Sequence, residues 1–384
     1  MPSRAQVGLS ELNASTRKFV SLLLRSGPMP RVELARRLSL TPASLTKLTR
    51  PMLDLGLFEQ VELPGKAATG RPTQPLSVNP EWAVFVGVKL TGDWIYTVLT
   101  DLAGAVLAAI DAPLRDRSVS TTCDQIIDHV NYVRGDLTPA GLCVSVAGSV
   151  IKSRGYIVAS PFLGWVNVDL AALLEERSHL PVVVENDLRA LTTGQHWFDD
   201  TLTSFALVTF GAGIGCGLVV DDRLIHGSVG AAGLVDHLRI DDHGPMCARG
   251  HRGCVSGYAT TDGILRSAAV AVPSAPPETL SDVGALARAG SLVAADVLRG
   301  AGYAVGCVIG TICNIAGPAR VILSGEGVEL FELLEDALRQ GISDVTHPAL
   351  PPIPVTTARL TFTDWARGAA VVAIQHHLDL RTPH

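Results

Sequence analysis

The stretch from residue 210 to residue 254 constrains the fold more than any other part of the chain. It contains the run Gly211-Ala-Gly-Ile-Gly-Cys-Gly217, the run Gly230-Ala-Ala-Gly233, and then His237, Cys247 and Cys254. Glycines let a backbone approach a polar ligand closely, and a His with a following Cys pair can bind zinc. The pattern predicts a ligand-binding loop beside a metal loop, although the first run is equally typical of tightly packed strands.

Charge is divided unevenly along the 384 residues. Residues 1–80 hold eleven Lys and Arg against five Asp and Glu, whereas residues 81–384 hold twenty against thirty-two. A chain of this length usually exceeds one hydrophobic core, so we expect domains at residues 1–80 and 81–384, the second with two lobes. The basic domain suits a polyanion such as double-stranded DNA, and the acidic one does not.

Composition also bears on the compartment. No secretory signal is recognisable, and the longest apolar runs, such as residues 301–315, are interrupted by Gly and Asn. We therefore expect a cytoplasmic, nucleoid-associated protein without a membrane partner. Seven Cys outside a secretory context indicate free thiols or metal ligands rather than a disulfide framework.

The basic domain has the pattern of a winged helix-turn-helix. Helices are predicted at residues 16–26, 31–38 and 41–55, the last capped by Thr41 and opened by Pro42. The third helix is predicted to bury an apolar stripe made of Leu45, Leu48, Met52 and Leu55. Strands are expected at residues 56–63 and in a second run that ends at Val78, which together would form the wing.

Outward polar side chains on the third helix and the wing are the candidate DNA contacts. The spacing of the helix would carry its polar stripe into a major groove, and the wing tip would probe a minor groove or a phosphate. The candidates are Thr41, Ser44, Lys47, Arg50 and Arg71. The alternative is a small helical bundle whose charges are only solvated.

Residues 81–384 alternate strands and helices, which indicates an α/β fold. Strands at 84–90, 95–100 and 105–110 form a predicted meander, followed by a helix at 124–132 and strands at 142–146 and 182–184. A similar order then repeats, with strands at 205–210, 217–220, 223–226 and 321–323 and a small-residue helix at 301–315.

Taken together, these motifs resemble the ROK family of repressors and sugar kinases, and the resemblance covers nearly the whole chain. It implies a winged helix-turn-helix followed by a two-lobed domain of the actin and hexokinase type, which is ribonuclease H-like. In the family's kinases an Asp supports magnesium and a Thr faces phosphate, where this chain has Lys89 and Asp93. The segment on the adenosine side is reduced to Ser324-Gly-Glu-Gly327. These departures imply no kinase activity, no ATP and no magnesium.

The residues that the family uses to bind sugar match this chain better than those that it uses to bind phosphate. It implies an effector site formed by Gly148, Asn186, Asp187 and His237, with residues 161–165 beside it. An Asn-Asp pair after a strand is also an ordinary helix cap. Two sugar-binding glutamates of the family are replaced here, by Leu234 and Ser256, so the effector is expected to differ from plain glucose or N-acetylglucosamine, or the site to be weak or empty.

The family's zinc pattern is kept only in part. Arg249 stands in place of the middle cysteine, which leaves His237, Cys247 and Cys254 as ligands. His251 has the spacing to complete a tetrahedron around a structural zinc ion, and His243 is a second option. The alternative is a pair of reduced thiols in a loop shaped by Gly250 and Gly253.

The resulting expectation is a sequence-specific transcriptional regulator, a repressor of carbohydrate uptake or catabolism genes. A sugar or sugar phosphate would control a homodimer or homotetramer on operator DNA. The alternatives are an active ROK sugar kinase with an accessory DNA-binding domain, and an architectural DNA-binding protein that needs no ligand.

Overall fold

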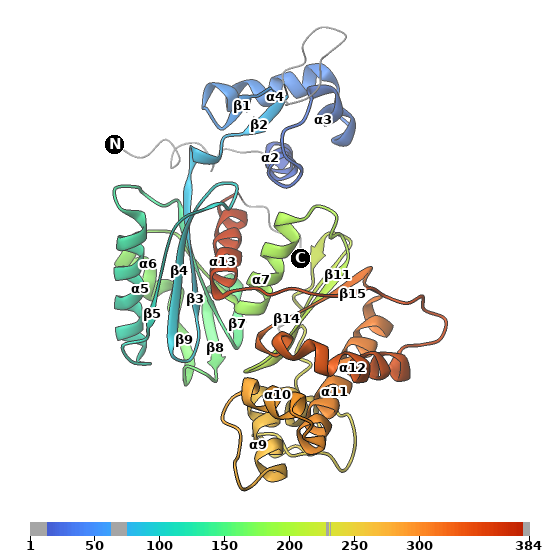
Figure 1. The fold of residues 1–384 in the computed structure, drawn as a ribbon. Coiled ribbons are helices and arrows are strands. Elements are labelled where there is room, and N and C mark those ends of the chain that lie inside the picture. The colour runs from blue at the N-terminus through green and yellow to red at the C-terminus, as the bar shows by residue number, and fades with distance from the viewer. Residues whose placement is uncertain (1–13, 63–74, 228–229, 231, 379–384) are drawn as a thin grey trace. The chain divides into compact units, whose positions relative to one another are not determined.

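The computed structural model describes residues 14–62, 75–227, 230 and 232–378 (Figure 1). The chain divides into two compact units, Met1–Thr201 with Phe362–His384, and Leu202–Thr361. The first unit holds the N-terminal helices together with one α/β lobe, and the second unit holds the other lobe. The boundary expected at residue 80 stays a prediction.

The N-terminal elements follow the predicted order. They are α2 (Ala14–Ser26), α3 (Arg31–Arg37), α4 (Pro42–Asp54), β1 (Phe58–Gln60) and β2 (Leu76–Val78). The Thr41 hydroxyl accepts the Ser44 backbone N–H at 3.2 Å, so the predicted cap of α4 is confirmed. β1 and β2 pair antiparallel, with Phe58 opposite Val78. Arg71 and the predicted wing tip lie outside the described residues.

One side chain of the predicted apolar stripe on α4 was placed wrongly. Leu45 is buried at 2% exposure and Thr49 at 1%, whereas Leu55 is 47% exposed. A helical period of 3.6 residues brings Thr49 onto the face of Leu45, while Leu55 is the C-cap residue and has left the helix. Ser44, Lys47 and Arg50 are exposed, as predicted.

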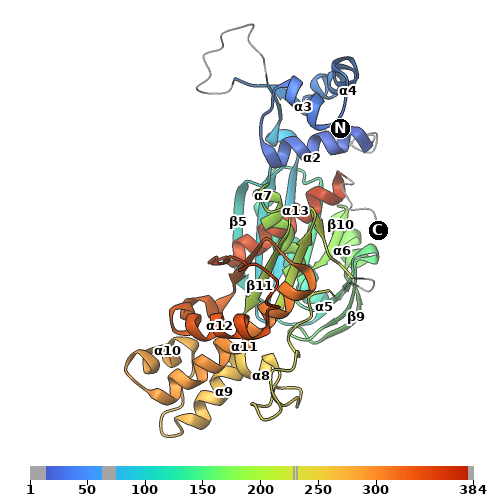
Figure 2. The same ribbon diagram turned by 90° about the vertical axis from the view of Figure 1, so that its right-hand side faces the viewer.

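The lobe in the first unit is built on a five-stranded sheet with the order β10-β6-β3-β4-β5. Its strands are β3 (Val84–Leu90), β4 (Trp94–Asp101), β5 (Val106–Pro113), β6 (Gly141–Val146) and β10 (Val182–Asn186). One face is covered by α5 (Val119–Arg134) and α6 (Leu170–Ser178), the other by α7 (Asp187–Phe198) and α13 (Phe362–His377) (Figures 1 and 2). A small sheet of β7 (Ser149–Ile151), β8 (Tyr156–Ser160) and β9 (Trp165–Asp169) follows β6.

The second unit repeats this topology. Its sheet has the order β13-β12-β11-β14-β15, formed by Arg223–Leu224, Ile214–Val220, Phe205–Phe210, Arg320–Ser324 and Val355–Thr357. In both sheets three antiparallel strands are followed by two parallel ones. The helices of this unit are α8 (Val255–Ala259), α9 (Thr261–Ala271), α10 (Leu280–Arg288), α11 (Leu292–Ala316) and α12 (Phe331–Val345). The predicted repeat of two α/β lobes is confirmed.

Two helices are longer than predicted. α5 begins at Val119, where Ser118 caps it, and α11 begins at Leu292, where Ser291 caps it. The first residues of α11 were missed because Leu292 and Val293 are exposed and break the buried pattern. Among the described residues, α11 alone is long and apolar enough to cross a bilayer, but 56% of its most apolar window is buried in the protein. It packs against α12, as a core helix does.

Candidate effector and metal sites

A buried ion pair joins the ends of two strands in the first unit. β3, β6 and β10 are parallel neighbours, with Lys89 level with Ser145 and Ser145 level with Glu185. The ammonium group of Lys89 therefore reaches the carboxylate of Asp187, the first residue of α7, and forms an ion pair with it. Lys89 is 4% exposed and Asp187 9%. The Lys89 ammonium also lies 4.8 Å from the ring centre of Trp365.

Asn186 has the helix-capping role that its position allows. Its side-chain oxygen accepts the Arg189 backbone N–H at 3.1 Å and so caps α7. Its side-chain N–H donates to the Gly148 carbonyl at 3.1 Å. A Cβ atom on Gly148 would lie 2.1 Å from the Ala159 carbonyl oxygen, so only glycine fits there. The structure thus brings Gly148, Asn186 and Asp187 together, while His237 belongs to the other unit.

A second buried charge cluster beside this site was missed by the sequence analysis. Glu185 is fully buried, and its two carboxylate oxygens lie 2.7 Å from Nε of Arg189 and 2.9 Å from Nζ of Lys152. Burial acts to raise the pKa of Glu185, but the two cations hold that pKa at about 2. The i, i+4 spacing of Glu185 and Arg189 was a local signal for one pair, whereas Lys152 is too distant in sequence to be found this way.

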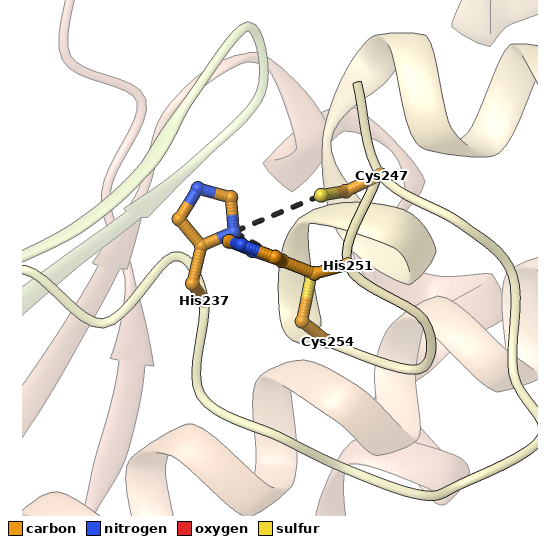
Figure 3. Close-up of side chains that lie close together, drawn as sticks. All are labelled: His237, Cys247, His251 and Cys254. Carbon is orange, nitrogen blue, oxygen red and sulfur yellow. Dashed lines mark hydrogen bonds between the residues drawn. The ribbon is translucent and has the colours of Figure 1, made fainter. Parts of the chain in front are cut away.

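The second unit contains the candidate metal site (Figure 3). Nδ1 of His237 lies 3.5 Å from Sγ of Cys254 and 3.8 Å from Sγ of Cys247. The ring of His251 lies edge-on to that of His237, with centroids 4.6 Å apart. One ligand atom from each of His237, Cys247, His251 and Cys254 lies within 4.8 Å of all the others. A tetrahedral zinc site with ordinary bond lengths needs separations of about 3.3 to 3.8 Å, so small side-chain shifts suffice.

Backbone pairing holds the metal loop in shape. The Val255 N–H donates to the Leu238 carbonyl at 2.9 Å, which holds the segment that follows Cys254 against the segment of His237. A Cβ atom on Gly253 would lie 2.0 Å from the Asp241 carbonyl oxygen, at a φ of +65°, so this turn needs glycine. Nε2 of His237 lies 3.3 Å from the Asp236 carboxylate, which leaves Nδ1 facing the two sulfur atoms.

The two thiols of this site differ in their pKa. Burial acts to raise the pKa of the Cys247 thiol, but backbone N–H groups of Arg249 and His251 lower that pKa overall. For Cys254 burial prevails and raises the pKa. A soft thiolate beside imidazole nitrogens suits zinc, and four protein ligands leave no open position, as in structural sites. His243, the second option for a fourth ligand, lies outside the four-residue cluster.

The two positions where family glutamates are replaced have different surroundings. Leu234 is largely exposed, whereas the Ser256 hydroxyl donates to the Asp236 carbonyl at 2.6 Å. Ser256 thus helps to hold the loop of His237. At the first unit's site, Trp165 from the predicted sugar loop donates its indole N–H to the Arg117 carbonyl at 2.6 Å.

Known proteins are similar to this chain over most of its length. A xylose repressor of Bacillus spizizenii is 25% identical over 366 residues, covering 93% of this chain and 94% of the relative. The DNA-binding transcriptional repressor Mlc of Escherichia coli is 26% identical over 340 residues and 83% of each chain. The crystal structure of a ROK family transcriptional regulator, a homologue of that repressor, has a TM-score of 0.82 at 23% identity, covering 94% of this chain and 95% of that one.

A solved kinase matches a smaller share of the chain. The ROK family glucokinase of Streptomyces griseus, solved with glucose and AMPPNP, has a TM-score of 0.66 at 24% identity and covers 76% of this chain and 100% of its own. The structure therefore defines a two-lobed α/β fold that is shared with solved ROK regulators and kinases, with further helices before the first lobe. The ROK family pattern matches residues 85–376, and the chain belongs to the ROK family.

Proposed function

We propose that this protein is a sequence-specific DNA-binding transcriptional regulator, a repressor of carbohydrate uptake or catabolism genes. Relatives that match it over most of their length are named as repressors, among them two xylose repressors and an N-acetylglucosamine repressor. The basic N-terminal domain, residues 1–80, would bind operator DNA in the cytoplasm. Residues 81–384 would sense a sugar and form the homodimer or homotetramer.

The ion pair between Lys89 and Asp187 carries this proposal. A phosphoryl-transfer site needs carboxylates that hold a cation and a free base that accepts the proton of the sugar hydroxyl. Here an ammonium stands at the end of β3 and takes the carboxylate of Asp187 as its partner. The arrangement favours ligand binding without turnover, and it counts against an active kinase with an accessory DNA-binding domain.

Helix α7 offers a route from this pair to the DNA-binding helices. Its first residue is Asp187, and near its other end Nε2 of His196 lies 3.1 Å from an Nη atom of Arg25 on α2. Phe19 of α2 belongs to the same buried cluster as Trp197 of α7 and Val371 of α13. A sugar that shifts α7 would therefore act on α2 directly, provided that it binds one position of α7 more tightly than the other.

The proposed DNA contacts are Thr41, Ser44, Lys47 and Arg50 on and before α4, together with Arg71, which the sequence predicts at the tip of a wing. The proposed effector contacts are Gly148, Asn186, Asp187 and His237. His237, Cys247, His251 and Cys254 would hold a zinc ion, which would brace the loop after β13 when bound. In this role the ion is structural, and the loop shape would depend on it.

Footprinting of the purified protein on genomic DNA, with and without free sugars, tests the proposal. We expect a small set of palindromic sites near transport or catabolic genes, and release from those sites by one sugar. The variant His196→Ala should bind the same sites but respond less to the sugar, because α7 loses its polar contact with Arg25 of α2. Uniform binding to unrelated DNA, unaffected by any sugar, would instead indicate a ligand-independent architectural protein.

A further inference from the structure

The first hairpin turn of each lobe is equivalent by topology. The turn at residues 91–93 joins β3 to β4, and the turn at 211–213 joins β11 to β12, the matching strands of the second sheet. A glycine turn can bind phosphate only through backbone N–H groups that are free to point at it. Whether either turn can bind phosphate therefore depends on what its N–H groups already bind within the chain.

In the second unit the carboxylate of Glu326 contacts the turn at 211–213. Oε2 of Glu326 accepts the Ala212 backbone N–H at 3.1 Å. A Cβ atom on Gly211 would lie 2.9 Å from the same oxygen, so the carboxylate rests directly against the glycine turn. Glu326 opens the 3-10 helix η3 (Glu326–Leu330), which follows β14.

Glycines bring this carboxylate to the turn. At a φ of +95°, a Cβ atom on Gly325 would lie 2.4 Å from the Phe210 carbonyl oxygen, and a Cβ atom on Gly327 would overlap the Phe210 ring. The segment that carries Glu326 therefore packs against the end of β11 more closely than any other residue type would allow. The contact between Glu326 and the turn at 211–213 therefore depends on the close backbone packing of Gly325 and Gly327 as well as on the Glu326 side chain.

In the first unit the matching turn is closed by its own side chains. The Thr91 hydroxyl accepts the Trp94 backbone N–H at 2.9 Å, and it lies 3.0 Å from the Asp93 carboxylate. At least one backbone N–H group in each turn thus has a partner within the chain, namely that of Asp93 and that of Ala212, and each turn carries a negative charge of the chain itself. A phosphate placed on either turn would displace a hydrogen bond and meet a like charge.

We propose that Glu326 determines ligand class in this domain: its carboxylate holds the anion position of the turn at 211–213 and excludes phosphate. A ligand that needs a phosphate at this turn, such as a nucleotide, is then excluded. This narrows the class of effector that the proposed regulator can bind. Only the role of the ligand as an effector rests on the proposed function. The exclusion itself is a property of the turn and can be measured without DNA.

Calorimetric titration of the full chain with tripolyphosphate tests the exclusion. We expect Glu326→Ala to bind tripolyphosphate at least about tenfold more tightly than the unchanged protein, because both the occupant and its charge are gone. Glu326→Gln, which keeps the shape and removes the charge, should show a smaller gain. The matched control is Glu329→Gln, exposed on the same 3-10 helix, which should bind as the unchanged protein does.

Two results would overturn the proposal. One is a Glu326→Ala protein that keeps its unfolding temperature yet gains no affinity for tripolyphosphate. The other is a Glu329→Gln protein that gains as much affinity for tripolyphosphate as Glu326→Gln does, because the effect would then come from net charge and not from the turn. Operator footprinting is a separate measurement, so a failure of DNA binding would leave the result on the turn intact.

Discussion

Lys89 and Asp187 form a buried ion pair across 98 positions of the chain, from inside β3 to the first residue of α7. Asp187 also accepts the Leu188 backbone N–H at 2.8 Å, so both of its oxygens are engaged. A carboxylate held in this way is poorly placed to accept a proton from a sugar hydroxyl. In the proposed function, this pair would make the strand ends of the first lobe a site that binds without catalysis.

Breaking this pair from one side should destabilise the protein. We expect Lys89→Met to lower the free energy of unfolding by about 3 kcal/mol, because it leaves a buried carboxylate without its cation. The double variant Lys89→Met with Asp187→Asn should recover most of the loss. Urea denaturation of the three proteins measures both effects, with the exposed Lys47→Met as control. A double variant no more stable than Lys89→Met would contradict the assignment of the loss to an uncompensated buried carboxylate.

Removal of zinc should loosen the second unit. We expect about one zinc ion per chain by elemental analysis, and a lower unfolding temperature after treatment with a chelator. Cys247→Ser, Cys254→Ser and His251→Ala should each lose most of the metal, whereas His243→Ala on the same loop should retain it. Full zinc content in His251→Ala would show that His251 is not a ligand.

Recognition of DNA should depend on the outward face of α4. Arg50→Ala should weaken binding to a footprinted operator by about 1 to 3 kcal/mol and relax the preference at one base position, while Lys47→Ala should weaken it on all sequences alike. Fluorescence anisotropy at fixed salt measures both. The control is Arg339→Ala, an exposed arginine paired with Glu335 on α12. Unchanged affinity in both α4 variants would rule out this helix as the recognition element.

Acid should destabilise the protein through His377 at the end of α13. Burial, aided by the charge of His376, lowers the pKa of His377 from about 6.5 to about 4. The neutral ring is favoured in the fold, so its contribution is complete above pH 6.5 and is lost as the pH falls towards 4. Between pH 6.5 and pH 5 the loss should approach about 2 kcal/mol. Urea denaturation of His377→Gln should show a correspondingly weaker pH dependence than that of the unchanged protein; identical profiles would contradict the assignment.

Local patterns explain what the sequence predicted correctly. Thr41 and Pro42 predict the start of α4, and the apolar runs of β3 and β10 predict strands. The lysine at position 89 was visible as a reversed charge. Its partner was not, because an ion pair between residues so distant in sequence depends on how β3 and β10 align in the sheet. The contact of Glu326 with the turn at 211–213 could not be predicted for the same reason, since these residues are also distant in sequence. The exposure of Leu55 was not predicted because Leu55 is the C-cap residue of α4, where the helical periodicity no longer determines which side chains are buried.

The most direct test of the account is mass spectrometry of free hexoses and pentoses incubated with the purified protein, ATP and magnesium. We predict no phosphorylated sugar above the background of a protein-free control, because the family resemblance implies a carboxylate at the position of Lys89, and Asp187 is held here in an ion pair with that lysine. Formation of a sugar phosphate at about one turnover per second or faster, as ordinary enzymes achieve, would contradict the account.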